Sequence, residues 1–320
     1  MRSTSRRTTA RRARLGAALA GLLTLSLLTP LAASAAGTGD ATSTAGAAVS
    51  TDFTLASFNV LGSSHTRYSA RYATGVERMR GVVRLLNRHA VDVVGFQEMQ
   101  GDQMQAFLDR TGGRYAVYPG FERVGPRSRV DTENSLAWDV TEWQAVEKTT
   151  VEIPYFDGKP RSMPVVKLRN LRTGMTAWFG NFHNPATNPR HPGQDGWRAQ
   201  AIAAEVALAR QLHRTHVPVF FTGDMNERAE VFCPMTGEAP MRAARGGTNR
   251  DGVCDAKHPW YVDWIFGTKR LRFRNYVEDT SPLVKRTTDH PVIVADAHVD
   301  PLKFPDATQP VPDPATLPGA

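Results

Sequence analysis

Eight polar residues capable of acid–base or metal chemistry stand where short apolar segments of the sequence begin or end. Four segments rich in β-branched and aromatic residues end in, or are followed by, such a residue, and two further segments carry one at or near their start. The residues are Asn59, Glu98, His183, Asp224, Asn226, Asp263, Asp289 and His290. Because the end of one strand and the start of its antiparallel neighbour share an edge of a sheet, one rim can hold all eight side chains.

Asp263 is the residue of this set that is hardest to explain as a turn former. It shares one face of an expected strand with Tyr261 and Ile265, so its carboxylate should be buried and needs a partner, for which a histidine is the obvious candidate. The segment 223–226 (GDMN), taken alone, is typical of an ordinary turn. Eight such groups at six strand boundaries together indicate a functional site.

The carboxylate and amide oxygens of Glu98, Asn59 and Asp289 suit a hard divalent cation. We expect Mg²⁺, with Mn²⁺ or Ca²⁺ as alternatives, because Mg²⁺ is usually held by one or two carboxylates together with substrate phosphate oxygens. Such an ion would neutralise and orient a phosphoryl group. These residue types therefore predict a metal-dependent hydrolase of phosphate esters.

The remaining residues of the set suit proton transfer. His183 and His290 can exchange protons near neutral pH, and a buried Asp263 would orient one of the two imidazoles. We expect Asp224 to lie beside the attacking water and Asn226 to hold a phosphate oxygen. Competing chemistries lack their sequence motifs, because the chain contains no G-x-S-x-G, H-E-x-x-H, G-x-x-x-x-G-K-[ST] or G-x-G-x-x-G pattern.

The segments that must position these residues predict a layered α/β fold. Thr74 and Glu77 form a capping box before a helix with Val76, Met79, Val83 and Leu86 on its buried face, and a second helix is expected over Trp197–His213 after Asp195. Strands are expected at Phe53–Leu61, Val91–Gln97, Ser135–Asp139, Pro164–Leu168, Thr176–Phe182, Val217–Thr222, Tyr261–Phe266, Leu271–Tyr276 and Pro291–His298. Several consecutive strands favour mixed sheets packed together under outer helices rather than a doubly wound fold.

Charge and composition indicate that this 320-residue chain has one folded part, with an N-terminal segment and a C-terminal segment that lie outside it. Six of the 39 basic residues lie within the first 14 positions, which leaves 33 basic against 31 acidic residues and little general attraction for polyanions. Residues 1–35 have the basic start, apolar run and Ala33-Ser34-Ala35 site of a secretory signal peptide, by the general or the twin-arginine route. We expect a flexible linker over 36–51, one catalytic domain over 52–299 and a Pro-rich disordered tail over 300–320.

The expected export bears on the oxidation state of the two cysteines. An even number of cysteines in a secreted chain favours a disulfide between Cys233 and Cys254, with two free thiols as the alternative. The bridge would fasten a surface loop. No later segment is apolar enough to anchor the protein stably in a membrane, so we expect a soluble extracellular monomer.

Six motifs, in order along about 240 residues, resemble those of the endonuclease/exonuclease/phosphatase superfamily. They are Ser57-Phe58-Asn59-Val60, Gln97-Glu98, Asn181-Phe182-His183, Gly223-Asp224-Met225-Asn226, Asp263-Trp264-Ile265 and Thr288-Asp289-His290-Pro291. The resemblance implies a four-layer sandwich of two packed mixed sheets flanked by helices. It also implies a Mg²⁺-type ion on Glu98 with Asn59 and Asp289 nearby, a pair formed by His290 and Asp263, and cleavage of a phosphoester. His183 resembles the corresponding histidine of the secreted deoxyribonucleases and sphingomyelinases.

Candidates for substrate binding are basic residues and histidines beyond the motifs. Arg270, Arg272 and Arg274 share one face of an expected strand and can track phosphates, unless they form an ordinary solvated face. His65, Arg190 and His191 follow motif segments and can contact a leaving group, and Arg123, Arg127 and Arg129 suggest a second basic loop. The tryptophan residues Trp138, Trp143 and Trp260 are candidates for insertion into lipid only by residue type.

These observations predict a secreted, divalent-metal-dependent phosphodiesterase, with nucleic acid as the favoured substrate. A sphingomyelinase-like lipid phosphodiesterase and a phosphomonoesterase are the alternatives within the same chemistry. A secreted protein that keeps the fold only to bind a ligand is the alternative outside it, although every expected site position is filled.

Overall fold

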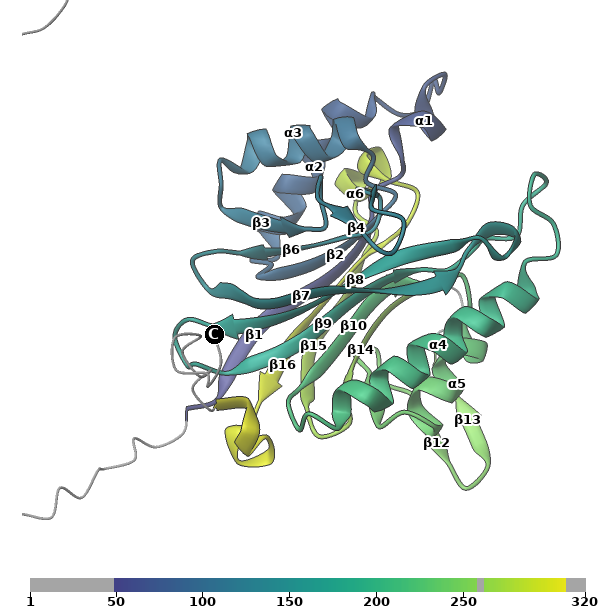
Figure 1. The fold of residues 1–320 in the computed structure, drawn as a ribbon. Coiled ribbons are helices and arrows are strands. Elements are labelled where there is room, and N and C mark those ends of the chain that lie inside the picture. Colours follow the sequence, from purple (N-terminus) through teal and green to yellow (C-terminus); the bar gives the residue numbers. More distant parts are fainter. Residues whose placement is uncertain (1–48, 258–261, 309–320) are drawn as a thin grey trace, which may run out of the picture. The chain divides into compact units, whose positions relative to one another are not determined.

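The computed structural model describes residues 49–257 and 262–308, which form two six-stranded mixed sheets flanked by helices (Figure 1). The first sheet has the order β15-β16-β1-β2-β6-β3, and the second has the order β11-β14-β10-β9-β8-β7. The strands of the first sheet are β1 (Thr51–Asn59), β2 (Val93–Gln97), β3 (Tyr115–Tyr118), β6 (Ser135–Asp139), β15 (Arg272–Asp279) and β16 (Val292–Val299). Those of the second are β7 (Trp143–Pro154), β8 (Pro160–Asn170), β9 (Thr176–His183), β10 (Val219–Asp224), β11 (Met241–Ala243) and β14 (Asp263–Thr268).

Helices cover the outer faces of both sheets, which confirms the predicted four-layer α/β sandwich. Figure 1 shows α2 (Gly75–Arg88), α3 (Gly101–Thr111) and α6 (Pro282–Thr287) on one side, and α4 (Asp195–His213) and α5 (Ala229–Gly237) on the other. The smaller elements are α1 (Ser63–Thr66), η1 (Phe156–Gly158), and the hairpins β4 (Arg123–Val124) with β5 (Arg129–Val130) and β12 (Thr248–Arg250) with β13 (Val253–Asp255). Buried side chains form one core between the sheets and under α4, and another under α2 and α3.

The first predicted helix has its capping box, but a different face is buried. The Thr74 hydroxyl accepts from the Glu77 amide, and the Glu77 carboxylate accepts from the Thr74 amide. Met79, Val82, Leu85 and Leu86 are buried, whereas Val76 is exposed and Val83 is only partly buried. The buried face is therefore rotated by about one position. The expected face of α4, formed by Ile202, Val206, Ala209 and Leu212, is buried as predicted.

The two sheets approach closely beneath the strand ends that carry the motifs. A Cβ on Gly95 of β2 would lie 2.0 Å from Oγ1 of Thr222 and 2.3 Å from Oδ1 of Asn181, so only glycine fits between the sheets. Beside it, the amide of Gln97 donates to Asn181 Oδ1 at 2.6 Å, and the amide of Asn181 donates to the Phe96 carbonyl at 2.7 Å. This buried polar layer fixes the height of one sheet relative to the other.

Both ends of the folded region differ from the expected boundaries. Thr51, assigned to the linker, is the first residue of β1 and pairs with Val299. Residues 300–308, assigned to the tail, contain the 3-10 helices η2 (Pro301–Lys303) and η3 (Pro305–Thr308), and their Phe304 and Ala307 are buried against the core. Apolar residues among the prolines thus extend the folded region. The expected signal peptide and residues 309–320 lie outside the described residues.

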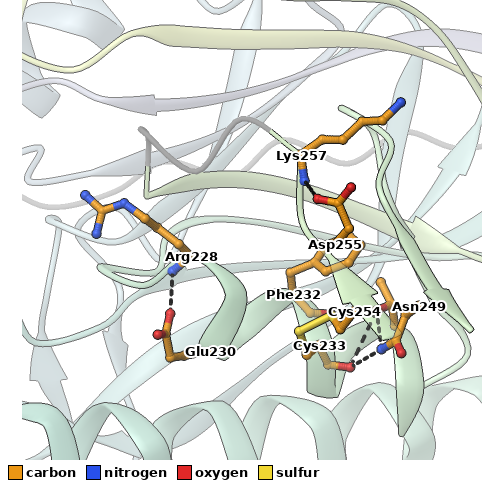
Figure 2. Close-up of a disulfide and its surroundings, with 9 residues drawn as sticks. Arg228, Glu230, Phe232, Cys233, Asn249, Cys254, Asp255 and Lys257 are labelled. Carbon is orange, nitrogen blue, oxygen red and sulfur yellow. Dashed lines mark hydrogen bonds between the residues drawn. A yellow bond between two sulfur atoms is a disulfide. The ribbon is translucent and has the colours of Figure 1, made fainter. Parts of the chain in front are cut away.

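The predicted disulfide is present and joins Cys233 of α5 to Cys254 of β13 (Figure 2), with 5.9 Å between the two Cα atoms. The side-chain amide of Asn249 supports it, donating to the Cys233 carbonyl at 2.8 Å and to Thr236 Oγ1 at 3.0 Å. The bridge therefore fastens the β12–β13 hairpin to α5. None of the helices in the described ranges is both long and apolar enough to cross a membrane.

Candidate active site

The ends of four strands from the two sheets meet at one rim. β1 runs parallel to β2, and β9 runs parallel to β10, so Asn59, Glu98, His183 and Asp224 all stand at or just beyond carboxyl ends. The amide nitrogen of Asn59 donates to Glu98 Oε1 at 3.0 Å and to Asp224 Oδ2 at 3.1 Å. One side chain thus connects the first sheet to the second.

His290 and Asp263 reach the same rim from the antiparallel strands β16 and β14. The two carboxylate oxygens of Asp263 lie 3.1 and 3.0 Å from His290 Nδ1, and Asp224 Oδ2 lies 3.7 Å from His290 Nε2. Asp263 is buried, as the sequence indicated. Burial alone would lower the pKa of His290, but the charges of Asp263 and Asp224 and the bond to Asp263 raise it well above its usual range. The two carboxylates therefore favour the protonated form of His290.

His183 approaches the same carboxylate oxygen of Asp224 as His290 does. Its Nε2 lies 3.6 Å from Asp224 Oδ2, and its Nδ1 lies 3.5 Å from the hydroxyl of Tyr155. Burial raises the pKa of Asp224, and the neighbouring Asp263 carboxylate acts in the same direction against the two imidazoles. Asp224 is thus a buried carboxylate between two histidines, a position from which it can accept a proton.

Glu98 is held ionised by its surroundings. Burial opposes its ionisation, but the bond with His65, the charge of His183 and the bond from Asn59 together hold the pKa of Glu98 well below its usual range. His65 Nδ1 lies 2.9 Å from Glu98 Oε2, which also accepts from the Gly62 amide at 3.0 Å. The bond to Glu98 in turn raises the pKa of His65.

Asn226 and Asp289 complete the predicted set at the edge of the site. The side-chain amide of Asn226 donates to the Asn184 carbonyl at 2.8 Å, and its backbone amide donates to Asp224 Oδ1 at 3.1 Å. Asp289 is exposed, and its charge helps to raise the pKa of both His65 and His290. All eight residues that the sequence singled out therefore gather at one rim.

The donor set fits a divalent cation. Asp224, Asp263 and His290 offer ligand atoms that all lie within 4.8 Å of one another, and Glu98 and Asp289 add carboxylates at the same rim. Buried carboxylates that repel one another are stabilised by a cation. Asn59 departs from the expected role, because its Oδ1 accepts from the Leu61 amide at 3.0 Å and its nitrogen faces the carboxylates. Asn59 orients Glu98 and Asp224 instead.

A hollow of about 700 Å³ opens over Glu98 and His183. His65, Arg190 and His191, which were expected near the substrate, line this hollow. The ring of His191 stacks on Phe156, with 4.1 Å between ring centroids, and its Nδ1 lies 3.1 Å from Asp157 Oδ2. His65 of α1 and the loop residues Arg190 and His191 therefore surround the same hollow as Glu98 and His183.

The expectation that Arg270, Arg272 and Arg274 bind substrate is not met by their position. Arg272 pairs with His298, which pairs with Asp52 near the start of β1, whereas the site lies beyond Asn59 at its end. At the usual strand rise, these ends of β1 are about 23 Å apart. Alternation predicted that the three arginines share a face, but the direction of β15 places them at the far end of the sheets.

Three contributors to the site carry no motif. Tyr155 and Arg161 come from the β7–β8 hairpin, where the Arg161 guanidinium lies 4.6 Å from the Tyr155 ring centroid and binds both oxygens of Asp131. Arg78 of α2 is buried and donates to the carbonyls of Val60, Leu61 and Thr287, which ties together the loops that carry Asn59 and His290. The sequence could have indicated Arg78, because it is a basic residue on the buried face of a helix.

Comparisons with known proteins agree with this geometry. The Endonuclease/Exonuclease/phosphatase family profile matches residues 56–290, and no curated protein matches the sequence. Among solved structures, an endonuclease/exonuclease/phosphatase family protein from Bacteroides thetaiotaomicron is 16% identical, with a TM-score of 0.61 over 79% of this chain and 99% of its own. The human Nocturnin catalytic domain with bound sulfate is 15% identical, with a TM-score of 0.59 over 77% of this chain and 94% of its own.

A third structure with this fold is a mannosyl-6-phosphatase from Bacteroides thetaiotaomicron, which is 15% identical with a TM-score of 0.55 over 77% of this chain and 99% of its own. At these identities the likeness concerns the fold, while the family match includes all six motifs except Pro291, the last residue of the sixth. The chain belongs to the endonuclease/exonuclease/phosphatase family of phosphoester hydrolases.

Proposed function

We propose that the protein is a secreted, divalent-metal-dependent phosphodiesterase of nuclease type. The observation that carries this proposal is the arrangement of Asp224 between two imidazoles, with His290 held by Asp263 and the ionised Glu98 joined to Asp224 through Asn59. Phosphoester hydrolysis needs carboxylates to bind a metal ion, imidazoles to transfer protons and a hollow to admit the substrate, and the site has all three.

Glu98 and Asp289 are the proposed ligands of Mg²⁺, with Mn²⁺ or Ca²⁺ as alternatives. The cluster of Asp224, Asp263 and His290 is close enough to hold a cation, but only with a neutral His290, so this set is an alternative to the protonated role of His290 described below. When bound, the ion would neutralise charge on the phosphoryl group.

The chain's own residues supply the proton transfers. Asp224, whose pKa is raised by burial, is placed to accept a proton from an attacking water. His290, protonated and oriented through Nδ1 by Asp263, is placed to stabilise a negative phosphoryl oxygen or to protonate a leaving group. His183 supplies a second imidazole, whose position is supported by Tyr155. Asn226 is proposed to hold a phosphate oxygen with the amide hydrogen that Asn184 leaves unused.

The choice of nucleic acid over lipid is supported by the positions of the tryptophans. Trp138 and Trp143 are buried, with 5% and 1% exposure, so neither can insert into a bilayer, and Trp260 lies outside the described residues. Arg190 and the Phe156–His191 stack in the hollow suit a phosphorylated, aromatic substrate. The fold itself does not identify the substrate class, since a mannosyl-6-phosphatase has the same fold.

Secretion is proposed from the N-terminal pattern and is supported by the disulfide between Cys233 and Cys254. Sequencing the N-terminus of protein recovered from the culture medium should find residue 36 first. Retention of residues 1–35 in the cell-associated protein, with none in the medium, would contradict export.

A substrate panel tests the proposed activity. The protein should be incubated with plasmid DNA, RNA, sphingomyelin, inositol phosphates and bis-nitrophenyl phosphate, each with Mg²⁺, Mn²⁺, Ca²⁺ or EDTA. We expect metal-dependent cleavage of nucleic acid and of the bis-nitrophenyl ester. Cleavage of sphingomyelin or monoesters alone would favour those alternatives. Metal-independent ligand binding without any cleavage would indicate a binding protein.

A further inference from the structure

A second hollow borders the one that opens over Glu98 and His183. It measures about 400 Å³ and lies between the β4–β5 hairpin and the β7–β8 hairpin. The two hollows share four lining residues, Tyr155, Phe156, Arg161 and His191. The two hollows are therefore neighbours, and these four side chains form the dividing wall between them. A ligand in the first hollow can reach past this wall into the second.

The dividing wall is firmly held and touches the catalytic cluster. Arg161 is bound by both oxygens of Asp131, at 2.7 and 2.9 Å, and lies against the Tyr155 ring. The Tyr155 hydroxyl, on the other side, lies 3.5 Å from His183 Nδ1. The Tyr155 side chain therefore lies between the second hollow and His183.

The second hollow carries an excess of unpaired positive charge. Arg127, Arg129 and Lys159 line it and are exposed, and within residues 49–257 and 262–308 their side chains form no ion pair. The charge of the Arg161 guanidinium is balanced by Asp131 and Glu133. Glu152 is the remaining carboxylate of the lining. Three such cations against one carboxylate favour an anionic ligand.

We propose that Arg127, Arg129 and Lys159 bind a second phosphate group of the substrate, next to the phosphodiester that is cleaved. The inference rests on the proposed phosphodiesterase activity and narrows its substrate class. The substrate carries at least two phosphates on one molecule, as a nucleic-acid strand does and as a small diester with a terminal phosphate also does. A simple diester fills only the catalytic hollow.

Three substrates separate the contributions. A dinucleotide has one phosphodiester and no other phosphate, a 5′-phosphorylated dinucleotide adds a terminal phosphate, and a trinucleotide adds a second phosphodiester. The test variant is Arg127→Gln/Arg129→Gln/Lys159→Gln. The matched control, Lys269→Gln/Arg270→Gln/Arg272→Gln, removes the same charges at the far end of the sheets. Thermal unfolding of both variants checks the fold.

We expect the test variant to lose at least tenfold more kcat/KM on the two larger substrates than on the dinucleotide, mainly through KM, while the control shows no such difference. A loss on both the 5′-phosphorylated dinucleotide and the trinucleotide would show that the second hollow binds any second phosphate. A loss on the trinucleotide alone would show that it binds the phosphate of a nucleic-acid strand. Equal losses on all three substrates, or no loss, would overturn the inference.

Binding provides a readout that does not depend on turnover. The affinity for a fluorescent single-stranded oligonucleotide, measured in EDTA at several salt concentrations, should depend less steeply on salt in the test variant. The logarithmic slope should become shallower by about 0.7 for each phosphate that the variant no longer binds. An unchanged slope refutes the subsite even if the enzyme is active. Absence of phosphodiester cleavage by the unaltered protein, with a reduced slope in the variant, refutes the proposed activity and leaves the subsite standing.

Discussion

His290, in the loop before β16 of one sheet, lies 3.0 Å through Nδ1 from a carboxylate oxygen of Asp263, the first residue of β14 in the other sheet. The loop of His290 is itself anchored to the first sheet, where Thr288 Oγ1 donates to the Asn59 carbonyl at 2.7 Å. The pair therefore exists only when the two sheets are packed against each other, so the site depends on contacts between residues far apart in the sequence.

Replacing His290 with alanine should remove most of the turnover. Loss of a positioned acid–base group typically costs about 10² to 10⁴ in rate. Removing the imidazole also leaves the buried Asp263 carboxylate without its partner, so the thermal unfolding midpoint should fall while the circular dichroism spectrum shows that the variant still folds. Initial rates on bis-nitrophenyl phosphate, beside circular dichroism, check this. Unchanged turnover would falsify the role of His290.

Asp263→Asn should shift the pH dependence of the reaction to lower pH. The Asp263 carboxylate is the largest favourable influence that raises the pKa of His290, so an amide in its place lowers that pKa. If the imidazolium is the active form, activity is lost as the pH rises through the His290 pKa, and this loss comes earlier in the variant. Rates measured between acidic and alkaline pH test the direction. An alkaline limb at the same pH in both proteins contradicts it.

Removing the metal should abolish activity, and Glu98→Gln should raise the Mg²⁺ concentration needed to restore it. Glu98 is held ionised, and an amide in its place loses the charge that attracts the cation. Activity after EDTA treatment, titrated with Mg²⁺ for both proteins, gives the two half-saturation points. The control Arg270→Gln, far from the site, should match the unaltered protein. Activity that persists in EDTA counts against a metal.

Glu205→Gln should make the protein more stable at alkaline pH. Glu205 of α4 is buried, and burial raises its pKa to about 8, with Asn184 partly offsetting the effect. Between its unfolded pKa near 4.5 and about 8, the folded protein keeps a proton that the unfolded chain releases, so stability falls as the pH rises through this window. Glutamine removes this loss. Urea unfolding at pH 5 and pH 8 should show the gain of the variant growing with pH; parallel curves would show that Glu205 does not titrate in this way.

Opening the disulfide should lower the stability without altering the catalytic residues. The bridge closes a loop with a sequence separation of 21 residues, which in the chain-entropy model corresponds to about 3 kcal/mol. Denaturant unfolding of Cys233→Ser/Cys254→Ser measures the loss, and the same variant with added reductant is the control, since the chain has no other cysteine. An unfolding free energy equal to that of the unaltered protein would show that the loop needs no staple.

Local signals predicted the parts of the structure that local interactions build. The Thr74–Glu77 capping box starts α2, and the polar residues at the ends of apolar strands mark the site. The β7 strand was missed because its side chains alternate between partly buried and exposed positions without a continuous apolar run. Tyr155 and Arg161 were missed with it, since the hairpin that carries them was not expected.

Residue types and their order along the chain determined the fold, the family and the eight residues that gather at the rim. Tertiary structure decided which amide atom Asn59 turns toward the carboxylates, and why Arg272 lies far from the rim while Arg127 lines a hollow that borders the one over Glu98 and His183. The reason is physical. Side-chain alternation along a strand specifies a face, but which end of a sheet a residue occupies depends on strand direction and on packing between sheets, which involve residues far apart in sequence.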